Sequence, residues 1–163
     1  MDMGEGISVD ADGNVFIAGG TSGTGSAGSW DAILTKLDAS GNTLWSKQVG
    51  GSGSDIGYST TVDMEGNSYL SGWANQDAFV VKYDPFGNEL WSEQLSTPDL
   101  EGASGVSVDK YGDIWLTGSM TGDMFGPNAG DYDAFLVRFA IPEPMTMSLI
   151  AIGGIAILRR RSR

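Results

Sequence analysis

The chain has 163 residues, enough for one domain with a hydrophobic core, and combines 25 glycines and 40% hydrophobic residues with only 18% charged residues. It contains no cysteine and no histidine, which excludes disulfides, the usual zinc sites, Ser-His-Asp catalysis and cysteine nucleophiles. The net charge is −12, and residues 1–142 hold 20 acids against 5 bases. So acidic a region does not bind nucleic acid, because phosphate binding needs clustered Lys and Arg.

Two sequence blocks recur along residues 1–140. The first block is VDADGNVFIAG (Val9–Gly19), VDMEGNSYLSG (Val62–Gly72) and VDKYGDIWLTG (Val108–Gly118). The second block, DAILTKLDASGNTLWSKQV from Asp31, recurs as DAFVVKYDPFGNELWSEQL from Asp77 and begins again as DAFLVRF from Asp133. The copies of the first block are 53 and then 46 residues apart. Periods of this size fit propeller blades of about four strands each.

Short β-rich runs are predicted to be strands at Val15–Ala18, Ser68–Leu70 and Ile114–Thr117. Each run follows a tight turn whose glycine (13, 66 or 112) needs positive φ, and the same turn chemistry recurs at Asp38–Asn42 and Asp84–Asn88. In the second block both strand faces are largely apolar, as expected for a sheet between two neighbouring sheets. We therefore predict an all-β fold of three antiparallel blades, with four strands in unit 2–55, four in unit 56–98 and three in unit 99–140.

The phrases GNTLWSKQVGGSGSDIGYSTTVDMEGNSYLSG and GDYDAFLVRF resemble the bacterial SBBP-type β-propeller repeat. In that family Asp-Ala-Phe, Gly-Asn-x-Leu-Trp and Val-Asp-x-x-Gly-Asn recur from blade to blade, and the resemblance covers roughly residues 2–140. Eleven strands do not close a ring. Asp2-Met3-Gly4 aligns with Asp55-Ile56-Gly57, so the chain begins inside a repeat. Two interpretations stay open: a piece of a longer protein, whose earlier part would supply a fourth strand to unit three, or a partial ring completed by another copy.

Residues 141–163 have a different character. Pro142-Glu143-Pro144 is followed by Met145–Leu158, fourteen residues without a charge, and then by Arg159, Arg160, Arg161 and Arg163. As a helix the apolar run would span about 21 Å, which snorkelling Arg side chains extend towards the thickness of a bilayer. The segment resembles the PEP-CTERM sorting signal. That resemblance implies that an exosortase-type enzyme recognises Pro142, Glu143 and Pro144. The Arg cluster Arg159, Arg160 and Arg161 would lie in the cytoplasm and residues 1–140 outside it.

Acidic residues suggest calcium at two places. Asp10–Asn14 has the look of part of an EF-hand loop but lacks the later ligands, and its equivalents lose the pattern, so turn formation is the favoured explanation. The loop between Gly122 and Asp133 is the better cation candidate, with Asp123, Asn128 and Asp131 as ligands. No other cofactor is expected.

Basic and aromatic residues also recur. Lys36, Lys82 and Arg138 occupy one position of three equivalent strands, where a ring of ligands for an anionic glycan is the functional interpretation. The favoured interpretation is that these cations form ion pairs with the Asp10, Asp63 and Asp109 series. Trp45 and Trp91 also recur and are expected to be residues of blade packing. Trp73 does not recur as Trp and is a candidate for stacking on a sugar, although a packed rim residue is the default. The loops from Gly19, Gly72 and Gly118 to the next aspartates differ in length and are the expected recognition surface.

The predicted function is a non-enzymatic protein of the cell surface or extracellular matrix that scaffolds or binds glycan or protein. Its expected partners are the processing enzyme, the membrane and an exopolysaccharide or surface protein. The alternative is part of a propeller enzyme whose catalytic residues lie in a missing N-terminal region. Most acids occupy equivalent positions in every unit, whereas catalytic carboxylates should be unique to one place. We therefore expect no enzymatic activity.

Overall fold

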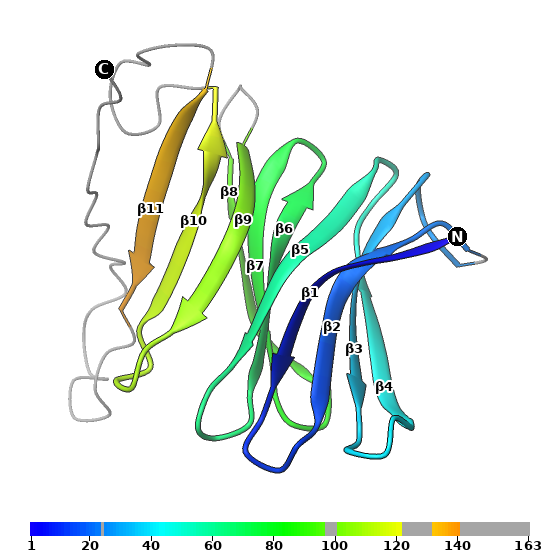
Figure 1. The fold of residues 1–163 in the computed structure, drawn as a ribbon. Coiled ribbons are helices and arrows are strands. Elements are labelled where there is room, and N and C mark those ends of the chain that lie inside the picture. The colour runs from blue at the N-terminus through cyan, green and yellow to red at the C-terminus, as the bar shows by residue number, and fades with distance from the viewer. Residues whose placement is uncertain (24, 97–100, 122–131, 141–163) are drawn as a thin grey trace.

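The computed structural model describes residues 1–23, 25–96, 101–121 and 132–140. Within these ranges the chain forms strands and turns, and Figure 1 shows three sheets standing side by side. The strands are β1 (Asp2–Val9), β2 (Val15–Thr21), β3 (Asp31–Leu37), β4 (Thr43–Val49), β5 (Asp55–Val62), β6 (Ser68–Ala74), β7 (Asp77–Tyr83), β8 (Glu89–Leu95), β9 (Glu101–Val108), β10 (Ile114–Met120) and β11 (Asp133–Phe139).

Each sheet is built from strands that follow one another in the chain. Sheet 1 has the order β1-β2-β3-β4, sheet 2 the order β5-β6-β7-β8 and sheet 3 the order β9-β10-β11, all antiparallel. The all-β class and the 4, 4 and 3 strands predicted from the repeats are thus confirmed in the described residues. The predicted C-terminal helix lies outside them. Within the described ranges no helix is long and apolar enough to cross a membrane.

The register of the three sheets is the same, residue for residue. Phe16 pairs with Lys36 in sheet 1, as Tyr69 pairs with Lys82 in sheet 2 and Trp115 with Arg138 in sheet 3. The first strand of each sheet carries a register shift at the same point, between Gly4 and Gly6 in β1. The repeated blocks therefore fold into superimposable units.

The turns that join these strands share one geometry. The glycines predicted to need positive φ adopt it, with φ of 82° at Gly13, 81° at Gly66 and 84° at Gly112. Among the described turns, only the one between β6 and β7 places non-glycine residues at positive φ, at Asn75 and Gln76. This two-residue connection has positive φ at both positions, as a type I′ hairpin requires.

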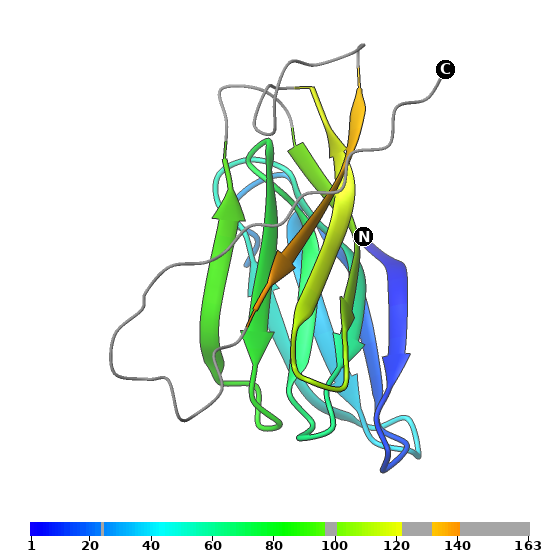
Figure 2. The ribbon, with the colours of Figure 1, turned by 90° about the vertical axis from the view of Figure 1, so that its left-hand side faces the viewer.

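Two faces of each sheet differ, and we name them by the third strand. The cation face carries Lys36 in sheet 1, Lys82 in sheet 2 and Arg138 in sheet 3, and the opposite face is the aliphatic face. The cation face of sheet 1 packs on the aliphatic face of sheet 2 (interface 1–2), and the cation face of sheet 2 packs on the aliphatic face of sheet 3 (interface 2–3). Figure 2 looks on sheet 3 at one end of this arrangement.

Both interfaces bury a hydrophobic core, and the first strands β1, β5 and β9 lie next to one another. The core of interface 1–2 includes Phe16, Leu34, Leu70, Phe79 and Val81. The core of interface 2–3 includes Tyr69, Val80, Leu116, Phe135 and Val137. Sheet 2 is apolar on both faces because it serves both cores, as the alternating apolar residues of β7 predicted.

Candidate functional site

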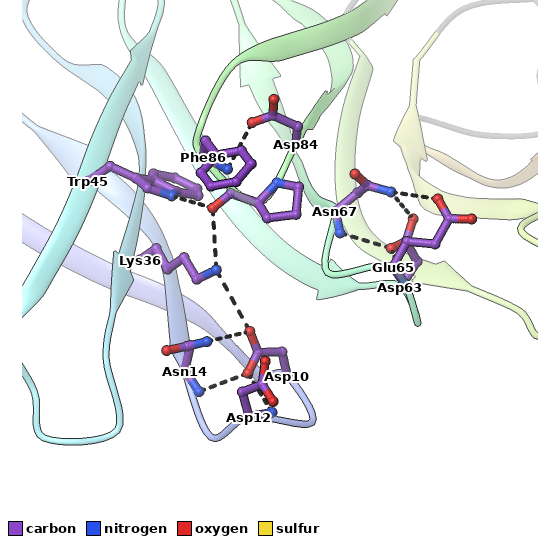
Figure 3. A network of polar contacts seen from close by, with 11 residues as sticks. Asp10, Asp12, Asn14, Lys36, Trp45, Asp63, Glu65, Asn67, Asp84 and Phe86 are labelled. Carbon is purple, nitrogen blue, oxygen red and sulfur yellow. Dashed lines mark hydrogen bonds and ion pairs between the residues drawn. The ribbon is translucent and has the colours of Figure 1, made fainter.

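The repeated aspartates hold the hairpin turns together. Asp10 Oδ1 accepts hydrogen bonds from the backbone N–H groups of Asp12 (3.0 Å) and Asn14 (2.8 Å), and its Oδ2 accepts one from the Asn14 side-chain amide (2.8 Å), as Figure 3 shows. Asp38, Asp63 and Asp84 make the same three contacts. These carboxylate oxygens are thus engaged in turn formation, which explains their recurrence without a metal ion.

A metal site is not evident in the part of the chain that the structure describes. These residues hold no group of three or more acids that could bind a metal ion. The candidate ligands Asp123, Asn128 and Asp131 lie outside the described residues. The sorting residues Pro142, Glu143, Pro144, Arg159, Arg160 and Arg161 lie outside them too.

Electrostatics at the turns favours the ionised carboxylates. Burial by itself raises the pKa of Asp63, but hydrogen bonds from Asn67 and the Tyr69 hydroxyl, together with the charge of Lys82, lower it overall. The pKa of Asp10 is lowered in the same manner, with Asn14 and Lys36 as the opposing influences to burial. Conversely, burial and the neighbouring Asp63 raise the pKa of Tyr69. Asp10 and Asp63 are therefore negative at neutral pH and serve as partners for Lys36 and Lys82.

The first two repeated cations are paired as the sequence predicted. Lys36 Nζ lies 3.8 Å from Asp10 Oδ2 and Lys82 Nζ lies 3.4 Å from Asp63 Oδ2, and both lysines are buried. Each ammonium also lies over an aromatic ring, that of Phe16 (5.1 Å) or that of Tyr69 (5.0 Å). These contacts favour ion pairing within each sheet over the alternative of a ring of ligands for an anionic glycan.

The third cation corrects the prediction. Arg138 pairs with Asp113, through Nε (2.9 Å) and a second guanidinium nitrogen, and not with Asp109. Asp113 occupies the position of Asn14 and Asn67, so only sheet 3 offers a second carboxylate there. The planar guanidinium binds that carboxylate through two nitrogens. Asp109 Oδ2 accepts instead from the Trp115 indole, at 3.3 Å.

The repeated tryptophans pack between sheets, as predicted. The Trp45 ring lies 6.1 Å from the ring of Phe16 in its own sheet and 6.1 Å from that of Tyr83 in sheet 2. Its Nε1 donates to the Pro85 carbonyl oxygen (3.1 Å), which also accepts from Lys36 Nζ (3.4 Å; Figure 3). Trp91 lies between Tyr69 (6.4 Å) and Phe139 (6.3 Å) at the next interface. These residues are structural.

A cavity of about 360 Å³ between sheets 2 and 3 is the best candidate for a ligand site. We call it the aromatic cavity, because Tyr58 of β5, Trp73 of β6 and Tyr132 before β11 line it. Its remaining described lining is Glu101, Gly102, Ser104 and Ser119. Tyr132 is 66% exposed, whereas Tyr58 and Trp73 are partly buried. Aromatic rings beside hydroxyl and carboxyl groups suit a ligand that has both apolar and hydrogen-bonding surface.

The first strands of neighbouring sheets are spaced differently at the two interfaces. At interface 1–2 a Cβ added to Gly6 would lie 2.7 Å from the Tyr58 carbonyl oxygen, so the backbones of β1 and β5 approach closely. Ser59 has the register position of Gly6 in sheet 2, and its Oγ accepts a hydrogen bond from Val106 N–H of β9 (3.3 Å). A side chain therefore stands between β5 and β9 where none separates β1 from β5. Beside the cavity, Gly102 leaves room next to the Trp73 ring, 4.0 Å from an added Cβ.

Two of the lining aromatics, Tyr58 and Trp73, are residues that do not repeat. Tyr58 stands where units one and three have Glu5 and Ser104, and Trp73 stands where they have Gly20 and Ser119. In sheet 1 Trp30 packs over Gly20 instead, since an added Cβ there would lie 3.2 Å from its ring. Sequence reasoning singled out Trp73 and the flanking loops but missed Tyr58 and Tyr132. Departure from the repeat at aligned positions was the signal that would have found Tyr58.

A larger cavity, of about 600 Å³, lies near the outer strands of sheets 1 and 2. Its lining includes the acids Asp55, Glu89 and Glu93, the polar residues Asn75, Ser92 and Gln94, and the core residues Phe79 and Val81. Both Asp55 oxygens already accept backbone N–H groups, from Gly51 (2.7 Å) and Asn75 (2.9 Å). Phe79 is the one aromatic among its described lining residues and belongs to the core, so we regard the aromatic cavity as the stronger candidate despite its smaller volume.

Comparison with known proteins identifies the repeat. Residues 44–79, which run from β4 into β7, match the family described as SBBP, beta-propeller repeat. The chain contains a β-propeller repeat. The match agrees with the three superimposable sheets and with the resemblance seen in the sequence, which extends over roughly residues 2–140. No curated protein matches the chain.

One solved structure that is similar to the chain is described as a protein of unknown function from Bacteroides caccae. The TM-score is 0.53 at 15% sequence identity, with 97% of this chain covered. The chain covers 46% of that protein's length. At this identity the likeness concerns the propeller-repeat fold alone.

Proposed function

We propose that this propeller-repeat chain is a non-enzymatic binding protein that holds a glycan in the aromatic cavity and is presented outside the cytoplasm. The convergence of non-repeated aromatic residues on one cavity carries the proposal. In a fold of superimposable units, positions shared by all units serve the common packing. Tyr58 and Trp73 depart from that pattern and line the same cavity as Tyr132.

The chemistry of the cavity fits a saccharide. Sugar rings present C–H faces that pack on aromatic side chains, and hydroxyl groups that pair with hydroxyls and carboxylates. Trp73 and the exposed Tyr132 offer ring faces, while Ser104 and Ser119 offer exposed hydroxyls. The excess of acids over bases in residues 1–142 favours a neutral or cationic glycan over an anionic one.

Binding without turnover is part of the proposal. Hydrolysis of a glycosidic bond uses two carboxyl groups that flank it. Among the described lining residues Glu101 is the single acid, and it is 2% exposed. Outside this cavity, Asp10, Asp63 and Asp113 pair with Lys36, Lys82 and Arg138. The described residues therefore support recognition better than catalysis.

The test is calorimetric titration of the full chain, in a mild non-ionic detergent, with the oligosaccharides that score highest on a glycan array. Trp73→Ala should weaken binding at least about 10-fold because a stacking face is lost. Gly102→Leu, which fills the space beside Trp73 without removing an aromatic ring, should do the same. Tyr111→Ala is the matched control, since Tyr111 is 70% exposed on the β9–β10 turn at the other end of these strands.

The glycan proposal would be contradicted if all three variants bound equally well, or if the chain bound no member of a broad set of glycans. Thermal unfolding of each variant shows whether a loss of binding comes from a loss of fold.

For localisation we propose that residues 141–163 act as a PEP-CTERM sorting tail. The support is the sequence itself: Pro142-Glu143-Pro144, the uncharged run Met145–Leu158 and the Arg cluster from Arg159. In a bacterium with an exosortase, the chain should be cleaved near Pro144 and leave the inner membrane. Glu143→Ala should remain uncleaved and membrane-bound, whereas Ser162→Ala should be processed normally. Processing of the Glu143→Ala variant at the normal rate would refute this role.

A further inference from the structure

Both interfaces between the described sheets join a cation face to an aliphatic face. One such face remains uncovered at each end of the three sheets. At interface 1–2 a cation face meets an aliphatic face, and interface 2–3 repeats the arrangement. In the described residues the aliphatic face of sheet 1 and the cation face of sheet 3 have no sheet packed on them. The ends of the assembly therefore carry complementary faces.

The open aliphatic face has the composition of a buried one. Ile17 takes the register position of Leu70 and Leu116, which are both 0% exposed. Ile7 takes the position of Thr60 (6% exposed) and Val106 (9%), yet it is 70% exposed. An exposed apolar surface that continues an internal packing pattern marks an interaction site.

The open cation face shows the same contrast. Ala134 is exposed, whereas its equivalents Ala32 and Ala78 are 0% exposed. Thr117 is likewise exposed, and Ser71 at its position is fully buried. Small residues at these points let a neighbouring sheet approach, as they do within the chain.

Hydrogen-bonding groups at the open faces match as well. Within the chain, Lys36 on a cation face donates to the carbonyl of Pro85 in the turn of the next sheet (3.4 Å). Ala39 holds the position of Pro85 in the Asp38–Asn42 turn beside the open aliphatic face. Arg138 holds the position of Lys36 on the open cation face. A sheet 3 packed on a sheet 1 would bring Arg138 to the Ala39 carbonyl.

We propose that two copies of this chain close one ring of six sheets, the cation face of sheet 3 in each copy packing on the aliphatic face of sheet 1 in the other. Head-to-tail contacts of one kind form a closed ring when their rotations add up to a full turn. The three sheets that the described residues form make six in two copies, within the four to eight blades that propellers typically have. This inference is independent of the proposed glycan site.

The experiment is sedimentation velocity of the full chain in a mild non-ionic detergent at physiological salt, which screens the repulsion between two acidic chains. The unaltered chain should sediment as a two-copy species. Ile7→Lys and Ala134→Lys each place a charge in the proposed interface at an exposed position, so each should be a folded monomer. Met64→Lys, a change at an 88% exposed turn residue, is the matched control and should remain a two-copy species.

Mixing the two disruptive variants tests the head-to-tail geometry. An Ile7→Lys copy keeps an intact sheet 3 and an Ala134→Lys copy keeps an intact sheet 1, so an equimolar mixture should recover two-copy species through one sound interface. A monomeric unaltered chain would overturn the proposal. Pairing of the Ala134→Lys variant alone would also overturn it, because it indicates contact between two aliphatic faces. Pairing of both variants would overturn it as well, because it indicates association through residues 141–163.

Discussion

Interfaces 1–2 and 2–3 are built from the same repeat but differ near their first strands. Gly6 lets β1 and β5 approach closely, whereas Ser59 stands between β5 and β9 beside the aromatic cavity. Near the outer strands a tryptophan packs at each interface, Trp45 at interface 1–2 and Trp91 at interface 2–3. Interface 1–2 is thus the more closed of the two near the first strands.

This difference shows how one interface of a repeat can hold a candidate site while the architecture stays the same. The strands, the register and the cation pairs are common to both interfaces. What changes is a few side chains at aligned positions, where Tyr58, Ser59 and Trp73 replace Glu5, Gly6 and Gly20. We infer that function in this fold lies in departures from the repeat.

The largest effect is expected from removing the tryptophan of each interface. Trp45→Ala and Trp91→Ala should each lower the free energy of unfolding by about 3–4 kcal/mol, because each change removes aromatic packing between two sheets, and Trp45→Ala also removes the hydrogen bond to Pro85. Urea denaturation followed by circular dichroism measures both values. Trp45→Phe, which keeps a ring and loses the indole N–H, should lie between the unaltered chain and Trp45→Ala. A Trp45→Phe variant as stable as the unaltered chain would mean that the hydrogen bond to Pro85 adds nothing to stability.

The spacing of the first strands gives the next effect. Gly6→Ser should destabilise the chain by about 2 kcal/mol, because the new Cβ meets the Tyr58 carbonyl oxygen and β1 must shift. Ser59→Ala removes only the hydrogen bond to Val106 N–H and should cost about 1 kcal/mol. The same denaturation assay ranks the two. If Gly6→Ser is as stable as the unaltered chain, the strands are not closely packed at interface 1–2.

The smallest effect is expected in the loss of stability at acid pH, to which the turn aspartates Asp10 and Asp63 should contribute differently. The pKa values of Asp63 and Asp10 are lowered in the folded state, so the stability they contribute is present above the ordinary Asp pKa of about 3.9 and is lost as the pH falls through the folded-state value. Asp63 also accepts a hydrogen bond from the Tyr69 hydroxyl (3.0 Å), which Phe16 cannot offer to Asp10.

Asp63→Asn should therefore reduce the difference in unfolding free energy between pH 7 and pH 3 more than Asp10→Asn does. Denaturation curves of both variants at the two pH values provide the measurement. An equal reduction in both variants would mean that the Tyr69 contact adds nothing to the stability of the ionised form.

Much of the fold was predictable because it depends on local chemistry that repeats. The positions of Gly13, Gly66 and Gly112 indicated turns, and the apolar residues on both faces of β7 indicated a sheet that is buried on both sides. The pairing of Lys36 and Lys82 followed from the cost of an unpaired buried charge. These inferences need only neighbouring residues in the sequence and the assumption that equivalent positions have equivalent environments.

The candidate site was less accessible to sequence reasoning because it joins residues from different units. Tyr58, Trp73 and Tyr132 meet only after sheets 2 and 3 pack, and their order along the chain does not indicate it. The wrong partner assigned to Arg138 has a similar origin. The repeat pattern pointed to Asp109, but a single change from Asn to Asp at position 113 offered the guanidinium a second carboxylate.

The hydrogen-bonded hairpin turns have a consequence for how the chain folds. Five of them close over short separations, from Asp10–Asn14 to Asp109–Asp113, and each needs only residues within its own turn. Hairpins of this kind form in about 1–10 μs, far faster than contacts between distant segments. We expect folding to begin at several turns in parallel and docking of preformed hairpins to be the slow step. Pulsed hydrogen exchange should then show protection at the turns of all three sheets before protection of Val106 N–H, which is bonded across an interface.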